Sequence, residues 1–259
     1  MNPAHPDLKS DFESRKRILE DPKDRAALAA LIDHTLLKMD AQERHIQAIA
    51  DEARIHRFRA VCVAGSSLEI LENYYKLPDF LLHKPRLCTV IGFPHGNTSS
   101  RAKIAEISAA LALGAEEFDY VQNVGWVRDG HWNKLTVEAQ KIVAAAQGKL
   151  VKVILETSFL SEEELYNSAL AAAQGGVHIL KTSTGFGNRG ATKNDLEILA
   201  RVQIDYKKNS NIDLGIKASG GIRSLTDALT MIQLGATRLG TSSGVILVSG
   251  LTSPGSDNY

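Results

Sequence analysis

The stretch that decides the fold is VHILKTSTGFG, residues 177–187. It begins as a short apolar run, places Lys181 among residues that favour β-strands, and then turns into hydroxyls and glycines. This pattern is typical of a strand that runs into a functional loop. A lysine in such a run needs an explanation, because ammonium groups are rarely buried unless they are paired or used.

A second lysine repeats the arrangement in DLGIKASGG, residues 213–221. Lys181 and Lys217 each end a strand-like run and precede a loop of small residues, which suggests amine chemistry beside a phosphate site. For one lysine alone, a charge that reaches solvent at a strand terminus is an equal alternative. The repetition favours the functional interpretation.

Short apolar runs alternate with helix candidates along the rest of the chain. Strands are predicted at 31–33, 59–63, 87–92, 117–121, 150–156, 177–181, 214–217 and 238–241. Helices are predicted near 41–56, 66–75, 99–113, 133–147, 161–174, 193–207 and 224–234, with a short one after Ser243 and with Ser161, Thr192 and Ser224 as N-caps. Strands separated by helices pair in parallel, and eight such units close a barrel. The predicted fold class is therefore α/β, a (β/α)8 TIM barrel.

The alternative fold is a doubly wound open sheet, which concentrates its chemistry at one switch point. Here nearly every predicted strand ends in polar residues or glycine, and a barrel gathers all strand ends at one mouth. We expect an N-terminal helical extension over residues 1–30, broken at Asp21-Pro22, then the barrel domain over 31–250 and a flexible C-terminal tail over 251–259.

The composition argues against several classes of partner. The 259 residues are 44% hydrophobic and 23% charged, with 30 basic and 30 acidic side chains, which gives no electrostatic case for binding nucleic acid or a membrane surface. No apolar stretch approaches the ~18 residues of a membrane helix, and no signal segment is evident. The only cysteines, Cys62 and Cys88, fit a reducing compartment, so we expect a cytoplasmic protein.

Strand alternation predicts that Asp119, Lys152, Lys181 and Lys217 share the barrel interior, if the larger apolar set of each strand faces the helices. A second ammonium about 6 Å away lowers a lysine pKa by about two units at an effective dielectric of ~20, and partial burial adds to this. One lysine can then attack an aldehyde or ketone to form a Schiff base, while Asp119 carries protons.

The loops after the last three predicted strands are rich in glycine and hydroxyls: GFG at 185–187, SGG at 219–221 and GTSSG at 240–244. Loops in these positions commonly hold phosphate in barrels. The histidines lack metal-ligand spacing, so we expect no metal. Cys62 faces inward by parity, and we interpret it as an inert thiol in the site, not a nucleophile.

These residues resemble deoxyribose-phosphate aldolase, a class I aldolase family built on a TIM barrel. The matching strings are IDHTLLK (32–38), AVCV (60–63), TVIGFPHG (89–96), GAEEFD (114–119), KVILET (152–157), LKTSTGFG (180–187) and KASGGIR (217–223). The resemblance runs in register across all eight predicted strands, and the pair of lysine strings is its most specific part.

The resemblance implies that Lys181 forms the Schiff base, Lys217 depresses its pKa, Asp119 relays protons and Asp33 supports the site. It also implies substrate contacts from Thr182, Thr184, Gly185, Gly187, Ser219, Gly220, Gly221, Ser242, Ser243, Cys62 and the terminal Tyr259. The implied reaction is the reversible cleavage of 2-deoxy-D-ribose 5-phosphate to D-glyceraldehyde 3-phosphate and acetaldehyde, with no metal or organic cofactor. The expected partner is a small phosphosugar, with no nucleic acid and no membrane; a homodimer and a homotetramer both stay open.

The chain departs from the family at a few positions. Ala64-Gly65 stands where many members have Asn-Pro, and Tyr120 and Gln122 replace residues that are usually aliphatic, which leaves substrate range and rate open. Two other interpretations remain: a related class I aldolase of different substrate preference, and a barrel that has drifted into a scaffold role. Retention of both lysines and Asp119 argues against the scaffold.

Overall fold

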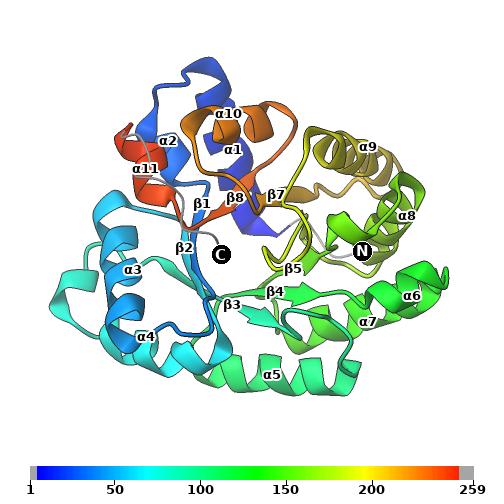
Figure 1. Cartoon of the computed structure of the whole chain (residues 1–259), viewed down its shortest axis with the longest axis horizontal. Coiled ribbons are helices and arrows are strands. Elements are labelled where there is room, and N and C mark those ends of the chain that lie inside the picture. Colours follow the sequence, from blue (N-terminus) through cyan, green and yellow to red (C-terminus); the bar gives the residue numbers. More distant parts are fainter. Residues whose placement is uncertain (1–4, 251–259) are drawn as a thin grey trace.

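The computed structural model describes residues 5–250, so Tyr259 and the predicted tail at 251–259 lie outside the described residues. Neighbouring strands pair in parallel and in sequence order, and β1 pairs with β8, which closes the sheet into a barrel (Figure 1). The strands are β1 (Ile32–Leu36), β2 (Ala60–Val63), β3 (Arg86–Ile91), β4 (Glu117–Val121), β5 (Leu150–Ile154), β6 (Ile179–Lys181), β7 (Gly215–Ser219) and β8 (Arg238–Thr241). The predicted (β/α)8 barrel is confirmed, and the open-sheet alternative is wrong.

Helices surround the barrel (Figure 1). They are α1 (Pro6–Glu20), α2 (Arg25–Ala29), α3 (Glu43–His56), α4 (Leu68–Tyr74), α5 (Ser100–Ala112), α6 (Val124–Arg128), α7 (Trp132–Ala145), α8 (Glu162–Gln174), α9 (Lys193–Ser210), α10 (Leu225–Gln233) and α11 (Gly244–Ser249), with 3₁₀ turns η1 (Gly65–Ser67), η2 (Pro78–Phe80) and η3 (Thr157–Phe159). The predicted N-caps Ser161, Thr192 and Ser224 each form a capping box with an acidic residue three positions on. Within residues 5–250, no helix has the length and apolar character to span a membrane.

Two local predictions need correction. β1 continues to Leu36, beyond the predicted end at residue 33, because Thr35 and Leu36 keep their register with Cys62 and Val63 of β2. The short helix α6 was not predicted. It forms directly after β4 because the side chain of Asn123 accepts a hydrogen bond from the backbone N–H of Trp126 and so caps the turn.

The apolar core lies between the strands and the helices, and the inside of the barrel is charged. Phe118, Val153 and Ile216 belong to the core cluster shared with the helices and are fully buried. The side chains that alternate with them along the strands point inward. Among these inward residues Asp33, Glu117, Asp119, Lys152, Lys217 and Arg238 are all 0% exposed. Buried charges on this scale require mutual pairing.

The helix α1 closes the N-terminal end of the barrel. Its Leu8 is 1% exposed and packs with Leu150 and Ile179, the first residues of β5 and β6. Gly215 at the start of β7 makes room for it, because a Cβ there would lie 3.0 Å from Leu8 Cδ2 and 2.8 Å from Ile179 Cγ1. The first two turns of α1 are therefore part of the barrel packing.

Candidate active site

Asp119 lies at the centre of the barrel and is held by three ammonium groups. Its Oδ2 accepts from Lys181 Nζ at 2.8 Å and from Lys217 Nζ at 2.9 Å, and its Oδ1 accepts from Lys152 Nζ at 2.8 Å. These lysines come from β6, β7 and β5, which follow β4 around the barrel. The structure thus brings together the four side chains that strand alternation placed in one interior.

Asp33 is the second carboxylate that binds Lys217. Because β1 closes the barrel against β8, Asp33 lies in register with Gly240, and its Oδ2 accepts from Lys217 Nζ at 2.5 Å. Burial alone would lower the pKa of Lys217, but the carboxylates of Asp119 and Asp33 outweigh it and raise the pKa well above its ordinary value. Lys217 is therefore a permanent cation next to Lys181.

Asp119 is ionised in this environment. Burial would raise its pKa, but the charges of Lys152, Lys181 and Lys217 prevail and hold the pKa well below the ordinary value. The pKa of Lys152 is raised well above its usual range, because Asp119, Glu117 and Asp33 outweigh the effect of burial. Lys152 and Lys217 thus stay charged, and both are fully buried, whereas Lys181 is 2% exposed.

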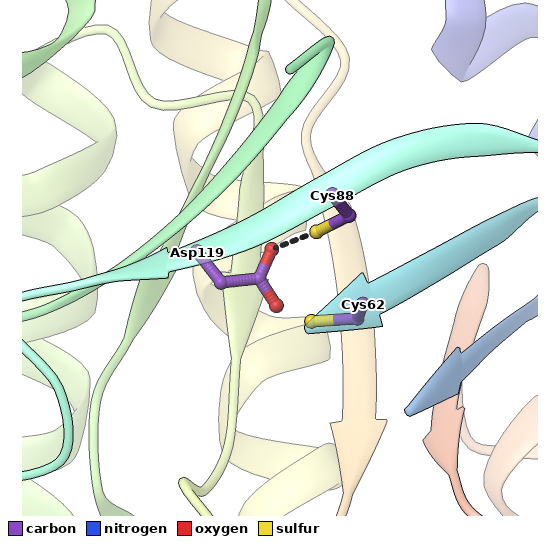
Figure 2. A group of neighbouring side chains, drawn as sticks. All are labelled: Cys62, Cys88 and Asp119. Atoms are coloured by element: carbon purple, nitrogen blue, oxygen red, sulfur yellow. Dashed lines mark hydrogen bonds between the residues drawn. The ribbon is translucent and has the colours of Figure 1, made fainter. Parts of the chain in front are cut away.

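Cys62 and Cys88 are register partners on β2 and β3, and both thiols face Asp119 (Figure 2). Cys88 Sγ donates to Asp119 Oδ1 at 3.4 Å. A hydrogen bond with Cys88 lowers the pKa of Cys62, whereas burial raises the pKa of Cys88 well above its usual value. Cys62 thus lies in the wall of the site, where it was predicted.

The same three groups offer potential metal ligands. Cys62, Cys88 and Asp119 present atoms within 4.8 Å of one another. Both oxygens of Asp119 already accept from ammonium groups, however, and Lys152 Nζ lies 3.5 Å from Cys88 Sγ. A metal cation placed here would face these positive charges at contact distance, so the donor set fits ammonium better than a divalent ion.

The loop after β5 brings a further carboxyl group to the mouth. Glu156 has left-handed backbone angles (φ 54°, ψ 61°) and is 5% exposed. Its Oε2 accepts from the hydroxyl and the backbone N–H of Thr184, while its Oε1 has no hydrogen-bond partner. Burial raises the pKa of Glu156 above its ordinary value. Its conformation aims the carboxyl at Thr184, three residues beyond Lys181.

Glu156 and Thr184 line a cavity of about 430 Å³ at the mouth of the barrel. Gly187 is also part of its wall, and a Cβ there would lie 2.9 Å from Glu156 Oε1. The other walls come from the loops after β3 and β4, including His95 and Asn123. This cavity lies on the β3–β6 side of the mouth, whereas the predicted phosphate loops follow β6, β7 and β8.

The predicted phosphate residues occupy adjacent loops. Gly220 lies against the loop after β6, because a Cβ on it would come within 2.8 Å of Gly190 Cα. Gly185, Gly220 and Gly221 have positive φ, and Ser242 and Ser243 follow β8 at the same end of the barrel. Ser242 is exposed and Ser243 is half-buried.

Thr182 and Ser219 instead link the two strands that carry the lysines. The Thr182 hydroxyl donates to the Ser219 carbonyl and accepts from its N–H, both at 3.1 Å, and Ser219 Oγ donates to the Ser183 carbonyl at 2.6 Å. Thr182 is fully buried. These bonds fix β6 against β7 and so fix the spacing of Lys181 and Lys217.

Sequence reasoning did not single out Glu117, Arg238 or Asp11 as site residues. Arg238 Nη1 donates to Asp33 Oδ1 at 2.6 Å, and the guanidinium also binds both oxygens of Glu117 at 3.2 Å. Glu117 lies two residues before Asp119 on β4 and therefore shares its face of the strand. Parity could have identified Glu117, but no sequence pattern connects Arg238 with Asp11, 227 residues away.

Comparisons with known proteins find related aldolases. A family model described as DeoC/LacD family aldolase matches residues 27–250. The deoxyribose-phosphate aldolase of Staphylococcus epidermidis strain RP62A is 41% identical over 225 residues, 87% of this chain and 97% of that protein. The deoxyribose-phosphate aldolase of Dictyoglomus turgidum is 41% identical over 227 residues, 88% and 98% of the two chains.

A solved structure shows the same architecture. The deoxyribose phosphate aldolase from Aeropyrum pernix, described as a unique tetrameric structure, superposes with a TM-score of 0.78 at 30% identity and covers 93% of this chain and 97% of its own. The aldolase QR15 superposes with a TM-score of 0.77, also at 30% identity, and covers 86% and 95% of the two chains.

Proposed function

The chain belongs to the DeoC/LacD aldolase family and is a lyase of the deoxyribose-phosphate aldolase type, and from this premise we propose its substrate and mechanism. It reversibly cleaves 2-deoxy-D-ribose 5-phosphate to D-glyceraldehyde 3-phosphate and acetaldehyde, through a Schiff base on Lys181. One observation carries the proposal: Lys181 and Lys217 share the Oδ2 of Asp119 in a buried site.

The nucleophile is the neutral amine of Lys181. Lys217 keeps its proton because two carboxylates bind it, so its charge repels a proton on the neighbouring amine. Lys181 is 2% exposed, whereas Lys152 and Lys217 are fully buried, so Lys181 is the lysine of the three that a sugar aldehyde is proposed to reach. Attack of Nζ on C1 gives a carbinolamine, and loss of water gives the iminium.

Carbon–carbon cleavage then follows from the iminium as electron sink. The C3 hydroxyl loses its proton, the C2–C3 bond breaks, and its electron pair moves into the enamine held on Lys181. Glyceraldehyde 3-phosphate leaves, the enamine is protonated at C2, and water releases acetaldehyde and the free amine. No external oxidant, reductant or metal is needed to balance these steps.

Asp119 is the proposed proton carrier. With three ammonium groups around it, the pKa of Asp119 is held far too low for it to take up a proton. Each time the Lys181 nitrogen is neutral, as amine, carbinolamine or enamine, one of these three charges is gone. The pKa of Asp119 then rises toward its usual range, so Asp119 can take up a proton as each neutral state forms, including the C3 hydroxyl proton as the iminium becomes the enamine.

The 5-phosphate is proposed to bind the loops after β6, β7 and β8, through Gly185, Gly220, Gly221, Ser242 and Ser243. Backbone N–H groups in positive-φ turns and small hydroxyls form good anion sites.

We propose that this chain also self-associates, since Leu81 and Leu82, consecutive in the chain, are 84% and 100% exposed.

Turnover of the purified protein tests the proposal. We expect glyceraldehyde 3-phosphate from 2-deoxyribose 5-phosphate, measured by a coupled dehydrogenase, with kcat/KM roughly 100-fold above that for 2-deoxyribose because phosphate contacts are worth about 2.7 kcal/mol. Equal turnover of both sugars would favour a related aldolase with another substrate. No turnover of either would favour the scaffold interpretation.

A further inference from the structure

The helix α1 contributes one carboxylate to the charged interior of the barrel. Asp11 is 1% exposed, and its Oδ2 accepts from Arg238 Nε at 2.8 Å. We propose that Asp11 is a positioning residue of the active site, which acts through Arg238 and Asp33 on the catalytic lysines. This proposal rests on the proposed function and adds the N-terminal helix to the catalytic machinery.

A continuous series of ion pairs runs from Arg238 to the nucleophile. Arg238 Nη1 donates to Asp33 Oδ1 at 2.6 Å, and the other oxygen of Asp33 accepts from Lys217 at 2.5 Å. Lys217 and Lys181 then meet at Asp119 Oδ2, at 2.9 and 2.8 Å. Asp33 therefore binds the guanidinium with one oxygen and the lysine with the other. A shift of Arg238 would move Asp33 and so change the hydrogen bond between Asp33 and Lys217.

A second branch leads to the same carboxylate. Both oxygens of Glu117 bind Arg238 at 3.2 Å, and Glu117 Oε2 lies 2.6 Å from Lys152 Nζ. Lys152 donates to Asp119 Oδ1 at 2.8 Å. Both branches from Arg238 thus end on Asp119, the group that orients the nucleophile.

Asp11 completes this network in geometry and in charge. Without it, the buried Nε–H of Arg238 loses its acceptor, and the guanidinium must tilt toward its remaining partners or admit water. Either change moves Asp33. The buried interior would also hold one more cation than carboxylates, and the excess positive charge lowers the pKa of its ammonium groups.

Asp11 is the part of the network that the family match leaves out. The match begins at residue 27 and includes Asp33, Glu117 and Arg238, but not α1. The groups that face Asp11 are Arg238, Arg59 at 3.6 Å and the charge of Glu117. Burial outweighs the two arginines and raises the pKa of Asp11 to about 6. At neutral pH Asp11 is therefore ionised, although burial disfavours its charge.

The test compares Asp11→Asn with Asp7→Asn. Asp7 lies one turn earlier on α1 and pairs with Arg86 at 2.7 Å and Arg59 at 3.2 Å, so it is a matched control that does not contact Arg238. For each variant, kcat and KM are measured across pH. Acylation of Lys181 by acetic anhydride, followed by mass spectrometry, gives the pKa of the amine without turnover.

For Asp11→Asn we expect kcat to fall about tenfold with KM within about twofold, because Asp11 lies at the end of the barrel opposite to the substrate mouth. The pKa of Lys181 from acylation should fall by about half a unit or more. Asp7→Asn should match the wild type, and Asp11→Glu should restore the wild-type pKa. If Asp11→Asn does not fold, Asp11→Ser, which leaves room for a water beside Arg238, should show the same shift.

Wild-type kcat and wild-type Lys181 pKa in a folded Asp11→Asn or Asp11→Ser protein would overturn the inference. An equal change in Asp7→Asn would also overturn it, because the effect would then be one of helix docking. A wild-type protein without turnover would contradict the proposed function alone, since the acylation readout still decides the role of Asp11.

Discussion

Lys181 and Lys217 donate to the same carboxylate oxygen, Asp119 Oδ2, at 2.8 and 2.9 Å. Their nitrogens are therefore less than about 6 Å apart, a separation at which one ammonium strongly opposes protonation of the other. Lys217 has a second carboxylate partner in Asp33, whereas within residues 5–250 Lys181 binds Asp119 alone. This asymmetry supports the proposal that Lys181 is the nucleophile.

Replacement of the permanent cation should slow the reaction and change its pH dependence. In Lys217→Leu, we expect kcat at pH 7 to fall about 100-fold and the acid limb of the profile to move to higher pH, because Lys181 loses the neighbouring cation that opposes its protonation. The matched control is Lys103→Leu, since Lys103 is also fully buried and ion-paired, with Glu138 at 3.0 Å, but lies outside the barrel. A Lys217→Leu enzyme with the wild-type profile would contradict the coupling.

Glu156 should matter for turnover although no strand pattern identified its role. In Glu156→Gln, the amide oxygen can still accept from Thr184, but an NH₂ group replaces the unpartnered oxygen Oε1. We expect kcat/KM for the phosphorylated sugar to fall about tenfold with unchanged thermal stability. Steady-state kinetics measure kcat/KM and a thermal melt measures the stability. Full activity in the variant would show that Glu156 has no role in turnover.

The phosphate loops are tested by a pair of adjacent glycines. Gly220 and Gly221 have nearly equal φ, 81° and 79°, so alanine is strained at both. Only at Gly220 would the new Cβ meet another loop, at 2.8 Å from Gly190 Cα. We expect Gly220→Ala to raise KM for 2-deoxyribose 5-phosphate more than about tenfold beyond Gly221→Ala, with little change for 2-deoxyribose. Equal effects on both sugars would place the phosphate elsewhere.

The pH dependence of stability should show two opposed groups. Asp11 has its pKa raised by burial from 3.8 to about 6, so its contribution to the free energy of unfolding is fully present below 3.8 and lost as the pH rises through 6. His178 has its pKa lowered by burial from 6.5 to about 4, so its contribution is present above 6.5 and lost as the pH falls through 4. Each shift corresponds to about 3 kcal/mol.

Urea denaturation between pH 6.5 and 4 measures this balance. The two effects nearly cancel in the wild type, so we expect a level curve there. Asp11→Asn should lose about 3 kcal/mol as the pH falls, and His178→Asn should gain about as much. Below pH 4 all three proteins should weaken, because the charge of Arg238 outweighs burial and lowers the pKa of Glu117 to about 2. Parallel curves of unfolding free energy between pH 6.5 and 4 would disprove the assignment of the two opposed effects to Asp11 and His178.

The fold and the centre of the site were predictable because they depend on short-range periodicity. Alternation along β4, β5, β6 and β7 sorts inward from outward residues, and a barrel then forces the inward ones to meet. Asp119, Lys152, Lys181 and Lys217 follow from this rule alone. The capping boxes are equally local, since cap and acidic partner are three residues apart.

The other parts of the site depend on contacts that the helix and strand periodicity of the sequence does not predict. Arg238 meets Asp11 only because α1 folds under the barrel, 227 residues away in sequence. Glu156 faces Thr184 because its backbone is left-handed, and no sequence pattern predicts that conformation for a glutamate. Such contacts set the geometry around the lysines, and they had to come from the structure.

The most direct test of the account is to trap the Schiff base. The protein is incubated with acetaldehyde, reduced with sodium borohydride, digested and mapped by mass spectrometry. We predict one added ethyl group, on Lys181, and none in Lys181→Ala, which should fold normally and have no activity. No adduct, or an adduct on Lys217 or Lys152 in place of Lys181, would contradict the central claim that Lys181 is the nucleophile.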